Sequence, residues 1–340
     1  MKIAINGFGR IGRNFLRAVL LDPQSARKLQ VVAINIGPGK PDCVAHMFKY
    51  DTLMGIYPGN IRVQDGNLCI DDYIIKIFTE SDPARIPWAA SGVEWVVEAS
   101  GCFTHKKDAS KHIVAGARHV LITAPAKEED ISIVPGVNEQ LFDSKKHTIV
   151  SMGSCTTNAF VTLLKVLHDA FIITGGFMTT VHAYTNTQVL LDVGDDDMRR
   201  CRAAALNIIP TSTGASEVVV KVMPELNGII KAVALRVPVA KVSLIDFTFT
   251  AQKLFTVETI HAALLHAKNN RMRGILDLTI EPLVSSDFSG NNYSVVIDGL
   301  LTEVNGTLGK VFGWYDNEWG YSVRLKDFLL YVAGEFSNSY

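Results

Sequence analysis

The sequence lacks the segments that direct a chain into or across a membrane. It begins Met-Lys-Ile-Ala-Ile-Asn-Gly, without the apolar stretch of roughly 7–15 residues and small-residue cleavage site of a secretory signal. No window approaches the roughly 18 uninterrupted apolar residues that a membrane-spanning helix needs. We therefore expect a cytoplasmic protein that makes no contact with a membrane.

Cysteine is scarce, and its spacing excludes two further classes of protein. The five cysteines are an odd number and contain no CxxC pair, so neither a disulfide framework nor a zinc site is indicated. We expect no metal. The cysteines are Cys43, Cys69, Cys102, Cys155 and Cys201.

An excess of charge of one sign is also missing. The 33 basic and 34 acidic residues give a formal net charge of -1, which gives no reason to expect nucleic acid or an acidic lipid surface as a partner. With 48% apolar and 20% charged residues, the composition is that of an ordinary globular protein. A length of 340 residues is long for one hydrophobic core and sufficient for two domains.

The first 150 residues alternate short apolar runs with helical stretches, the pattern of a parallel sheet built from strand–helix–strand units. Helices are expected at Arg10–Leu21 and Lys106–Ala117. The expected strands are Lys2–Asn6, Val31–Asn35, Trp95–Ala99, Val120–Thr123 and Thr148–Ser151.

After Cys155 the strands become longer and richer in Val, Thr and Phe, which favours mostly antiparallel pairing with helices on one face. These strands are expected at Phe177–His182, Ala232–Val237, Val242–Thr250, Tyr293–Asp298 and Lys310–Trp314. The fold class is thus an α/β Rossmann-type domain followed by an α+β domain. We place the first at 1–154 and the second at 155–319, with a helix at 320–340 returning to the first.

A GxGxxG motif lies between the first strand and the first helix, in Gly7-Phe8-Gly9-Arg10-Ile11-Gly12. In a dinucleotide-binding domain the first glycine makes a tight turn and the second lets the backbone approach a pyrophosphate. The third lets helix and strand pack closely, and the helix N-terminus stabilises the phosphate charge. The alternative is a glycine-rich turn without a ligand, but strand, turn and helix in this order favour a nicotinamide dinucleotide.

One element of the dinucleotide pattern is missing. The acidic residue that would bind the adenine ribose hydroxyls is expected directly after Asn35, and Ile36 stands there. An isoleucine accepts no hydrogen bond, and it also removes a charge that would repel a 2′-phosphate. We therefore hypothesise that the site tolerates or prefers NADP, and leave the choice between NAD and NADP open.

Two residues of the second half form a candidate nucleophile and base. Cys155 precedes the amphipathic stretch Ala159–Ala170, so it is expected at a helix N-terminus, where the dipole lowers a thiol pKa. His182 closes the apolar strand Phe177–Val181. Taken singly, each is more often a structural residue. Taken together, thiolate and imidazole are a recognisable catalytic pair.

Several dispersed segments resemble those of phosphorylating glyceraldehyde-3-phosphate dehydrogenases, in that family's order and spacing. With Ile3–Arg13 and Lys49-Tyr50-Asp51, the resemblance runs from the first strand to the last helix. The segments are Ser154–Asn158, His182–Thr185, Arg199–Gly214, Arg236-Val237-Pro238 and Trp314–Tyr321.

The resemblance implies a mechanism. Cys155 attacks the aldehyde of glyceraldehyde 3-phosphate, and His182 acts as base while hydride leaves for NAD or NADP. Inorganic phosphate then cleaves the resulting thioester to give 1,3-bisphosphoglycerate, in glycolysis or gluconeogenesis. The backbone N–H of Cys155 and the ring of His182 are expected to stabilise the oxyanion.

The resemblance also implies two anion sites and further cofactor contacts. Thr187 stands where the family often has an aspartate, and Arg202 is expected on a solvated, salt-bridged face. The substrate phosphate is assigned to Thr185, Thr187 and Arg236, and the attacking phosphate to Ser154, Thr156, Arg200, Thr213 and Gly214. Cofactor contacts are assigned to Gly7, Gly9, Arg10, Ile11, Gly12, Thr123 and Asn317.

The segment Tyr184–Leu206 corresponds to a loop that reaches a neighbouring subunit in the family, which implies a homotetramer. Within it Val193-Gly194 departs from the common Leu-Pro. Two other functions stay open. One is an erythrose-4-phosphate dehydrogenase, which shares the cysteine and histidine but releases an acid by hydrolysis. The other is a dinucleotide-binding protein without catalytic activity.

Overall fold

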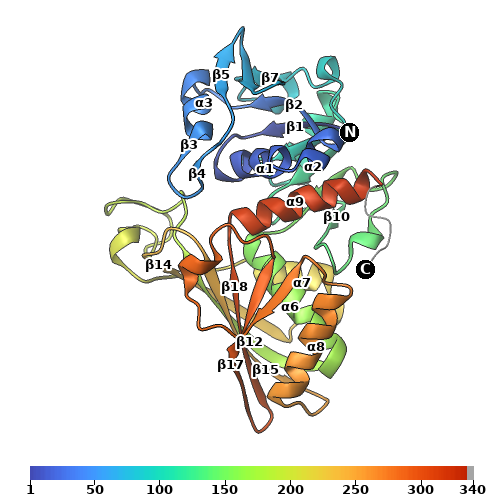
Figure 1. Ribbon diagram of the computed structural model, residues 1–340, viewed down its shortest axis with the longest axis vertical. Coiled ribbons are helices and arrows are strands. Elements are labelled where there is room, and N and C mark those ends of the chain that lie inside the picture. Colours follow the sequence, from blue (N-terminus) through green and yellow to red (C-terminus); the bar gives the residue numbers. More distant parts are fainter. Residues whose placement is uncertain (335–340) are drawn as a thin grey trace. The chain divides into compact units, whose positions relative to one another are not determined.

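The computed structural model describes residues 1–334 and divides into two compact units (Figure 1). Unit 1 comprises Met1–Ile133, Glu139–Gly153 and residues 325–334, and unit 2 comprises Val134–Asn138 and Ser154–Arg324. The part of the expected C-terminal helix beyond residue 334 lies outside the described residues. Within the described part of the chain, no helix has the length and apolar character needed to cross a membrane.

Unit 1 is built on a nine-stranded sheet with the order β10-β11-β9-β8-β1-β2-β7-β6-β5. Seven neighbouring strands are parallel, and β6 (Asn67–Ile70) and β5 (Ile61–Gln64) extend the sheet in antiparallel fashion. The parallel strands are β10 (Ile131–Ser132), β11 (Ile149–Ser151), β9 (His119–Ile122), β8 (Trp95–Glu98), β1 (Lys2–Asn6), β2 (Gln30–Asn35) and β7 (Tyr73–Phe78). This confirms the expected Rossmann-type domain.

Helices connect the parallel strands, because parallel neighbours require crossover connections. A small hairpin of β3 (Tyr50–Asp51) and β4 (Gly55–Ile56) is separate from the main sheet. The helices of unit 1 are α1 (Arg10–Leu20), α2 (Pro23–Lys28), α3 (Pro41–Lys49), α4 (Lys106–Ala109) and α5 (Lys111–Val114), with short 3₁₀ turns at Pro83–Arg85, Ala89–Ser91 and Glu139–Leu141.

The single helix expected at Lys106–Ala117 is wrong. It is divided at Ser110 into α4 and α5 and ends three residues early. The Ser110 hydroxyl donates to the carbonyl of Lys106 at 2.8 Å, and Ile113 N donates to Ser110 O, three residues back. A serine hydroxyl that bonds to the preceding turn competes with the regular helical pattern, and the tighter bond interrupts it.

Unit 2 contains a seven-stranded sheet with the order β13-β14-β12-β15-β18-β17-β16. Four of its six pairings are antiparallel, and only β14–β12 and β17–β16 are parallel. This confirms the expected, mostly antiparallel sheet. The strands are β12 (Ile173–Ala183), β13 (Ile209–Thr211), β14 (Ile230–Val237), β15 (Ser243–Ala251), β16 (Leu276–Thr279), β17 (Val295–Asn305) and β18 (Leu308–Tyr315).

Helices α6 (Cys155–Phe171), α7 (Ala215–Val222) and α8 (Val257–Asn269) lie on one face of this sheet (Figure 1). Phe160 of α6 packs edge-on against Phe247 of β15, with ring centroids 5.0 Å apart, and both are fully buried. Further 3₁₀ turns lie at Ala204–Leu206, Pro224–Leu226 and Ser285–Phe288. The core formed by α6 and the sheet gives the first turn of this helix a rigid support.

The last helix, α9 (Trp319–Val332), begins in unit 2 and ends in unit 1. Its Phe328 packs edge-on against Trp95 and Phe142, at 6.0 and 5.5 Å between ring centroids. Lys326 donates to the Asp22 carboxylate at 3.0 Å. These contacts join the second half of α9 to the core of unit 1.

Candidate active site

The first turn of α6 presents Cys155. Ser154 is the N-cap, and its hydroxyl accepts the backbone N–H of Thr157 at 3.1 Å. The side-chain amide of Asn158 donates to Ser154 O at 3.0 Å. Because a serine in this position satisfies an otherwise unpaired N–H, α6 begins at Cys155 as the sequence predicts.

Strand pairing brings two basic side chains together in the same unit. His182 on β12 lies opposite Arg236 on β14 in the parallel register. Nη1 of Arg236 donates to Nδ1 of His182 at 2.5 Å. The imidazole is 4% exposed. The site thus combines a buried imidazole with a guanidinium that binds it directly.

Cys155 and His182, which are 27 residues apart, meet in unit 2. Sγ of Cys155 lies 3.5 Å from Nε2 of His182. This is within the distance for a hydrogen bond to sulfur, and unliganded catalytic pairs are often longer than in the reacting complex. The arrangement satisfies the geometric condition for a nucleophile beside a base.

The expectation of a lowered pKa for the Cys155 thiol is not met. Burial raises the pKa of the Cys155 thiol, and this outweighs the positive charge of Arg236 and the hydrogen bonds from Thr156, which act in the opposite direction. Removing a thiolate from water disfavours the charged form more than the helix N-terminus and one cation stabilise it. The resting pair is therefore a thiol beside a neutral imidazole.

His182 is held neutral for the same physical reason. Burial and then the charge of Arg236 lower the pKa of His182 from 6.5 to about 3, although the carbonyl of Ala183 acts in the opposite direction. An uncharged imidazole at neutral pH has the protonation state that a general base requires. Burial also lowers the pKa of Arg236, and the electrostatic interaction with Cys155 acts in the opposite direction.

The residues assigned to the two phosphates are divided among the start of α6, strand β14 and neighbouring loops. The hydroxyls of Thr185 and Thr187 lie 3.0 Å apart. At the start of α7, the Thr213 hydroxyl accepts Ala215 N at 3.3 Å, and Gly214 is the N-cap without a side-chain cap. Each set presents hydroxyls or N–H groups, which are suitable donors for phosphate oxygens.

Arg200 lies in a salt-bridged arrangement with the aspartates of its loop. Its guanidinium is 3.3 Å from Asp195 and 3.5 Å from Asp197, and its side chain is 42% exposed. Its charge is nevertheless close enough to lower the pKa of Arg236. Arg202, expected on a solvated face, is paired with Asp192 at 2.8 Å.

Tyr315 is a residue of this site that the sequence analysis left without a role. Its buried hydroxyl lies 2.8 Å from Oγ1 of Thr156 and 2.7 Å from Oγ1 of Thr180. Its ring also contacts His182 edge-on, with 6.0 Å between centroids. Burial raises the pKa of Tyr315, so its hydroxyl stays neutral. A lone tyrosine within a recognised motif carries no sequence signal for these distant partners.

Unit 1 contains a cavity of about 640 Å³ beside the GxGxxG turn. Its lining includes Gly7, Gly9, Asn35 and Ile36, all from the carboxyl ends of β1 and β2 or the turns after them. Ligands of open α/β sheets bind at this edge. Because of its position and its lining residues, the cavity is therefore suited to bind a dinucleotide.

The three glycines of the motif fulfil different steric requirements. A Cβ on Gly7, whose φ is +91°, would lie 2.4 Å from Cα of Ser100, and one on Gly12 would lie 2.3 Å from the oxygen of Gly7. At Gly9 a Cβ meets open space. Gly9 is also the N-cap of α1 and provides no side-chain cap, so the first N–H groups of the helix face an approaching anion.

The other assigned cofactor residues lie around or outside this cavity. Arg10 and Ile11 open α1, and the Arg10 side chain forms an ion pair with Asp51. The Thr123 hydroxyl donates to the carbonyl of Glu98 at 3.1 Å, and Thr123 does not line the cavity. Asn317, in unit 2, accepts a hydrogen bond from Ser243 at 3.3 Å.

No group of three or more histidine, cysteine or acidic side chains suited to a metal ion occurs among residues 1–334.

Two family profiles match the chain. The profile described as "Glyceraldehyde 3-phosphate dehydrogenase, NAD binding domain" matches residues 1–106, and the one described as "Glyceraldehyde 3-phosphate dehydrogenase, C-terminal domain" matches residues 154–317. The second match contains Cys155, His182 and Arg236.

Curated proteins match over nearly the whole length. The chain is 47% identical over 334 residues to "Glyceraldehyde-3-phosphate dehydrogenase 1" of Bacillus subtilis (strain 168), covering 98% of each chain. It is 46% and 48% identical over 336 residues to the "Glyceraldehyde-3-phosphate dehydrogenase" of Geobacillus stearothermophilus and of Priestia megaterium, covering 98% of this chain and 99% of each relative.

Proposed function

Because this chain belongs to the glyceraldehyde-3-phosphate dehydrogenase family, we propose that Cys155 is its nucleophile and His182 its base. The reaction is the oxidation and phosphorylation of glyceraldehyde 3-phosphate to 1,3-bisphosphoglycerate, with NAD or NADP as cofactor. The observation that supports the two assignments is the 3.5 Å distance between Sγ and Nε2 at the N-terminus of a buried helix.

The chain's own residues carry out the following steps. Sγ of Cys155 forms a bond to the aldehyde carbon, giving a hemithioacetal, and His182 accepts its hydroxyl proton as the carbon loses hydride. NAD or NADP, when bound, supplies the hydride acceptor. The product on Cys155 is a thioester. An oxygen of inorganic phosphate then bonds to the acyl carbon and the C–S bond breaks. The leaving sulfur takes the proton that His182 accepted, which restores the thiol and the neutral imidazole.

Two anion sites serve this sequence of steps. We assign the substrate phosphate to Thr185, Thr187 and Arg236, supported by two adjacent hydroxyls and a half-buried guanidinium. We assign the attacking phosphate to Ser154, Thr156, Arg200, Thr213 and Gly214. The Arg200 side chain is partly exposed and is paired with aspartates. A phosphate that binds there would therefore replace these carboxylates as the partner of the guanidinium.

For the cofactor we assign the pyrophosphate to Gly7, Gly9, Gly12 and the backbone of Arg10 and Ile11. The open space at Gly9 and the uncapped start of α1 support this placement. Thr123 and Asn317 are assigned to the nicotinamide end, on the family resemblance alone. Functionally we divide the chain into a cofactor domain, 1–154, and a catalytic domain, 155–319, with the last helix completing the cofactor domain.

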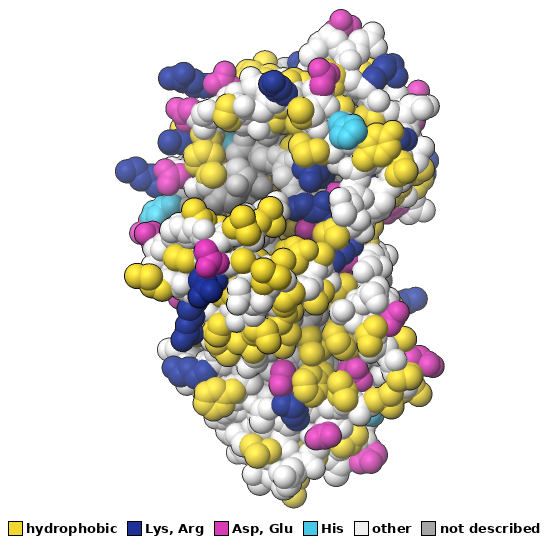
Figure 2. Space-filling view, turned by 90° about the vertical axis from the view of Figure 1, so that its left-hand side faces the viewer, with side chains coloured by type: hydrophobic (Ala, Val, Ile, Leu, Met, Phe, Trp, Pro, Cys, Tyr) yellow, Lys and Arg dark blue, Asp and Glu magenta, His cyan; other side chains and the backbone are white. Residues whose placement is uncertain are grey.

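We propose that the protein works as a homotetramer in the cytoplasm. Apolar side chains are exposed on the loop after β12 and on the sheet of unit 2, and Figure 2 shows hydrophobic side chains gathered on the face it presents. The exposed apolar side chains of unit 2 include Leu190, Leu191, Met198 and Leu206 of the loop, and Phe177, Val233, Leu300 and Leu301 of the sheet. Exposed apolar patches of this kind mark protein–protein interfaces. Light scattering with size-exclusion chromatography measures the oligomeric state.

The experiment that tests the proposed roles is a turnover assay with and without inorganic phosphate, on the unaltered chain and on Cys155→Ser. Phosphate-dependent turnover that Cys155→Ser abolishes, with cofactor binding retained, supports the thioester route. Turnover unchanged without phosphate would indicate the erythrose-4-phosphate dehydrogenase reaction instead, and the names of the curated relatives do not favour it. Cofactor binding without turnover would indicate a non-catalytic protein.

A further inference from the structure

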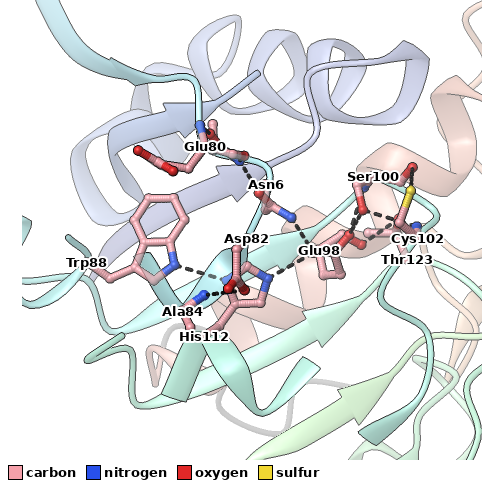
Figure 3. Close-up of polar contacts among 11 residues, drawn as sticks. Asn6, Glu80, Asp82, Ala84, Trp88, Glu98, Ser100, Cys102, His112 and Thr123 are labelled. Carbon is pink, nitrogen blue, oxygen red and sulfur yellow. Dashed lines mark hydrogen bonds and ion pairs between the residues drawn. The ribbon is translucent and has the colours of Figure 1, made fainter. Parts of the chain in front are cut away.

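A chain of buried polar side chains crosses unit 1 at the ends of three parallel strands (Figure 3). Asn35 of β2 donates to Oδ1 of Asn6 on β1 at 2.7 Å, and Asn6 donates to Oε2 of Glu98 on β8 at 2.5 Å. The same Oε2 of Glu98 lies 2.9 Å from Nε2 of His112. Nδ1 of the same imidazole lies 3.0 Å from Nε1 of Trp88.

At the Trp88 end of this series of hydrogen bonds, the indole determines the tautomer of His112. An indole N–H only donates, so Nδ1 of His112 must accept, and the ring proton is on Nε2. His112 therefore donates to Glu98 as a neutral imidazole. A second proton on Nδ1 would place two donors 3.0 Å apart within a fully buried cluster, where an unpaired donor costs free energy.

The opposite end is fixed by backbone. Asn35 Oδ1 accepts Glu80 N at 2.9 Å, and Asn35 Nδ2 donates to Glu80 O at 2.9 Å. A backbone N–H and a backbone carbonyl cannot exchange roles, so the orientation of the Asn35 amide is determined. Asn6 must then accept from Asn35 through Oδ1 and donate to Glu98 through Nδ2.

Glu98 is consequently the point at which hydrogen bonds from both ends converge. Oε2 accepts hydrogen bonds from Asn6 and His112. Oε1 accepts hydrogen bonds from the Ser100 backbone N–H at 2.8 Å and from the Ser100 hydroxyl. The Ser100 hydroxyl itself accepts Cys102 N at 3.1 Å, and its own proton is donated to Glu98. All four donors require an acceptor-only group, so Glu98 is an ionised carboxylate that is 1% exposed.

The groups that Glu98 holds form one edge of the cavity in unit 1. Asn6, Asn35, Ser100 and Cys102 all line it, whereas Glu98 and His112 do not. Gly7, the first glycine of the dinucleotide motif, follows Asn6 directly and packs against the backbone of Ser100. A displacement of Asn6 or Ser100 therefore moves the turn that approaches the cofactor.

We propose that Glu98, oriented by His112 and Trp88, is a positioning residue for the dinucleotide cofactor. Its charge is used to hold the ends of β1 and β8 and the turn at Ser100, and not to contact the ligand. This inference rests on the proposed cofactor site. It predicts that the carboxylate matters for cofactor affinity even though it lies outside the cavity.

The first test is Glu98→Gln, which keeps the volume but replaces one acceptor with a donor. In one orientation the NH2 group of the new amide faces the donors Asn6 and His112. In the other orientation the NH2 group faces the backbone N–H of Ser100. Because a donor meets a donor in either case, the Kd for NAD or NADP, measured by calorimetry, should rise about 10- to 100-fold. The matched control is Glu94→Gln. The Glu94 carboxylate accepts a hydrogen bond from the backbone N–H of Lys2, and Glu94 does not line the cavity.

A second pair of variants tests the role of the hydrogen bonds at His112. His112→Phe removes the acceptor for Trp88 and the donor to Glu98, and should weaken cofactor binding about tenfold. His112→Gln offers an acceptor and a donor on separate atoms, and should recover most of that loss. A merely space-filling role predicts the opposite order, because the aromatic ring resembles the imidazole more closely in shape.

The rate of Cys155 alkylation by iodoacetamide serves as a measure of intact unit 2 in every variant. We expect it to stay within about twofold while the cofactor Kd changes. Equal cofactor Kd values for Glu98→Gln and the unaltered chain, or His112→Gln binding no better than His112→Phe, would overturn the inference. If the unaltered chain binds neither NAD nor NADP, it is the proposed cofactor site that fails.

Discussion

Nη1 of Arg236 and Nδ1 of His182 are 2.5 Å apart, and the same imidazole nitrogen lies 2.6 Å from the carbonyl oxygen of Ala183. A guanidinium only donates and a carbonyl only accepts, so the two neighbours demand different tautomers of His182. With Arg236 donating, the ring proton is on Nε2 and faces Cys155. In the proposed complex, in which Arg236 binds the substrate phosphate, Nδ1–H would donate to Ala183 and Nε2 would be the base.

Replacing Arg236 should slow the alkylation of Cys155. Arg236 is the positive charge that lowers the pKa of the thiol, against the larger effect of burial. Its loss also raises the pKa of His182, but continued burial keeps the imidazole neutral at pH 7. For Arg236→Gln we expect iodoacetamide to react about tenfold more slowly at pH 7, since one pKa unit is a tenfold change in thiolate.

Arg202→Gln is the matched control for this measurement, because Arg202 pairs with Asp192 on an exposed face. Its alkylation rate should equal that of the unaltered chain. Equal rates for Arg236→Gln and Arg202→Gln would contradict the assignment of the electrostatic role to Arg236.

The buried imidazole should make the folded state less stable in acid. The folded-state pKa of His182 is about 3, below its ordinary 6.5. Between those values the unfolded chain binds a proton that the folded chain does not, so stability falls as pH falls through this window. The slope from this residue is at most ~1.4 kcal/mol per pH unit.

His182→Asn removes that titration, so its stability relative to the unaltered chain should rise steadily from pH 6.5 to pH 4. Denaturant unfolding at each pH measures the difference, with His266→Asn, at an exposed position of α8, as control. A difference between His182→Asn and the unaltered chain that does not change with pH would show that His182 is not held neutral by burial.

The identity of residue 36 should influence the choice of cofactor. Ile36 lines the cavity of unit 1 and offers neither a hydrogen-bond acceptor nor a charge. A carboxylate there would accept ribose hydroxyls and repel a 2′-phosphate. For Ile36→Asp we expect the ratio of kcat/KM for NADP to that for NAD to fall about 10- to 100-fold.

Ile36→Asn accepts a hydrogen bond without adding charge, and should change the same ratio much less. A strong preference of the unaltered chain for NAD would refute the hypothesis that Ile36 admits NADP. Steady-state kinetics with both cofactors decides the point.

The Tyr315 hydroxyl should contribute to both stability and phosphate use. It bonds to the buried hydroxyls of Thr156 and Thr180, which lose a partner in Tyr315→Phe. We expect a loss of about 1–3 kcal/mol in the free energy of unfolding. Because Thr156 is assigned to the attacking phosphate, the KM for inorganic phosphate should also rise.

Tyr73→Phe, on an exposed tyrosine of unit 1, controls for the loss of a hydroxyl and should affect neither quantity. A Tyr315→Phe variant with lowered stability but an unchanged KM for phosphate would limit Tyr315 to a structural role.

Several local features of the chain were predicted correctly because neighbouring residues determine them, although the division of the helix at Ser110 was not predicted. Short-range periodicity and glycine spacing are sufficient to predict β1, the turn at Gly7 and the helix that begins at Arg10. The amphipathic stretch Ala159–Ala170 likewise predicts a helix with Cys155 at its N-terminus. The pairing of Cys155 with His182 was inferred from the chemistry of a thiol and an imidazole, and the family resemblance supported it.

Tertiary structure decided what depends on distant partners and on burial. Arg236 reaches His182 because β12 and β14 pair in one register, and Tyr315 bonds to Thr156 across 159 residues of sequence. The pKa of Cys155 is raised because the fold removes the thiol from water, although its helix position alone favours the thiolate. Sequence thus determined which groups the chain carries. Folding determined their hydration and their hydrogen-bond partners, because both depend on residues far away along the chain.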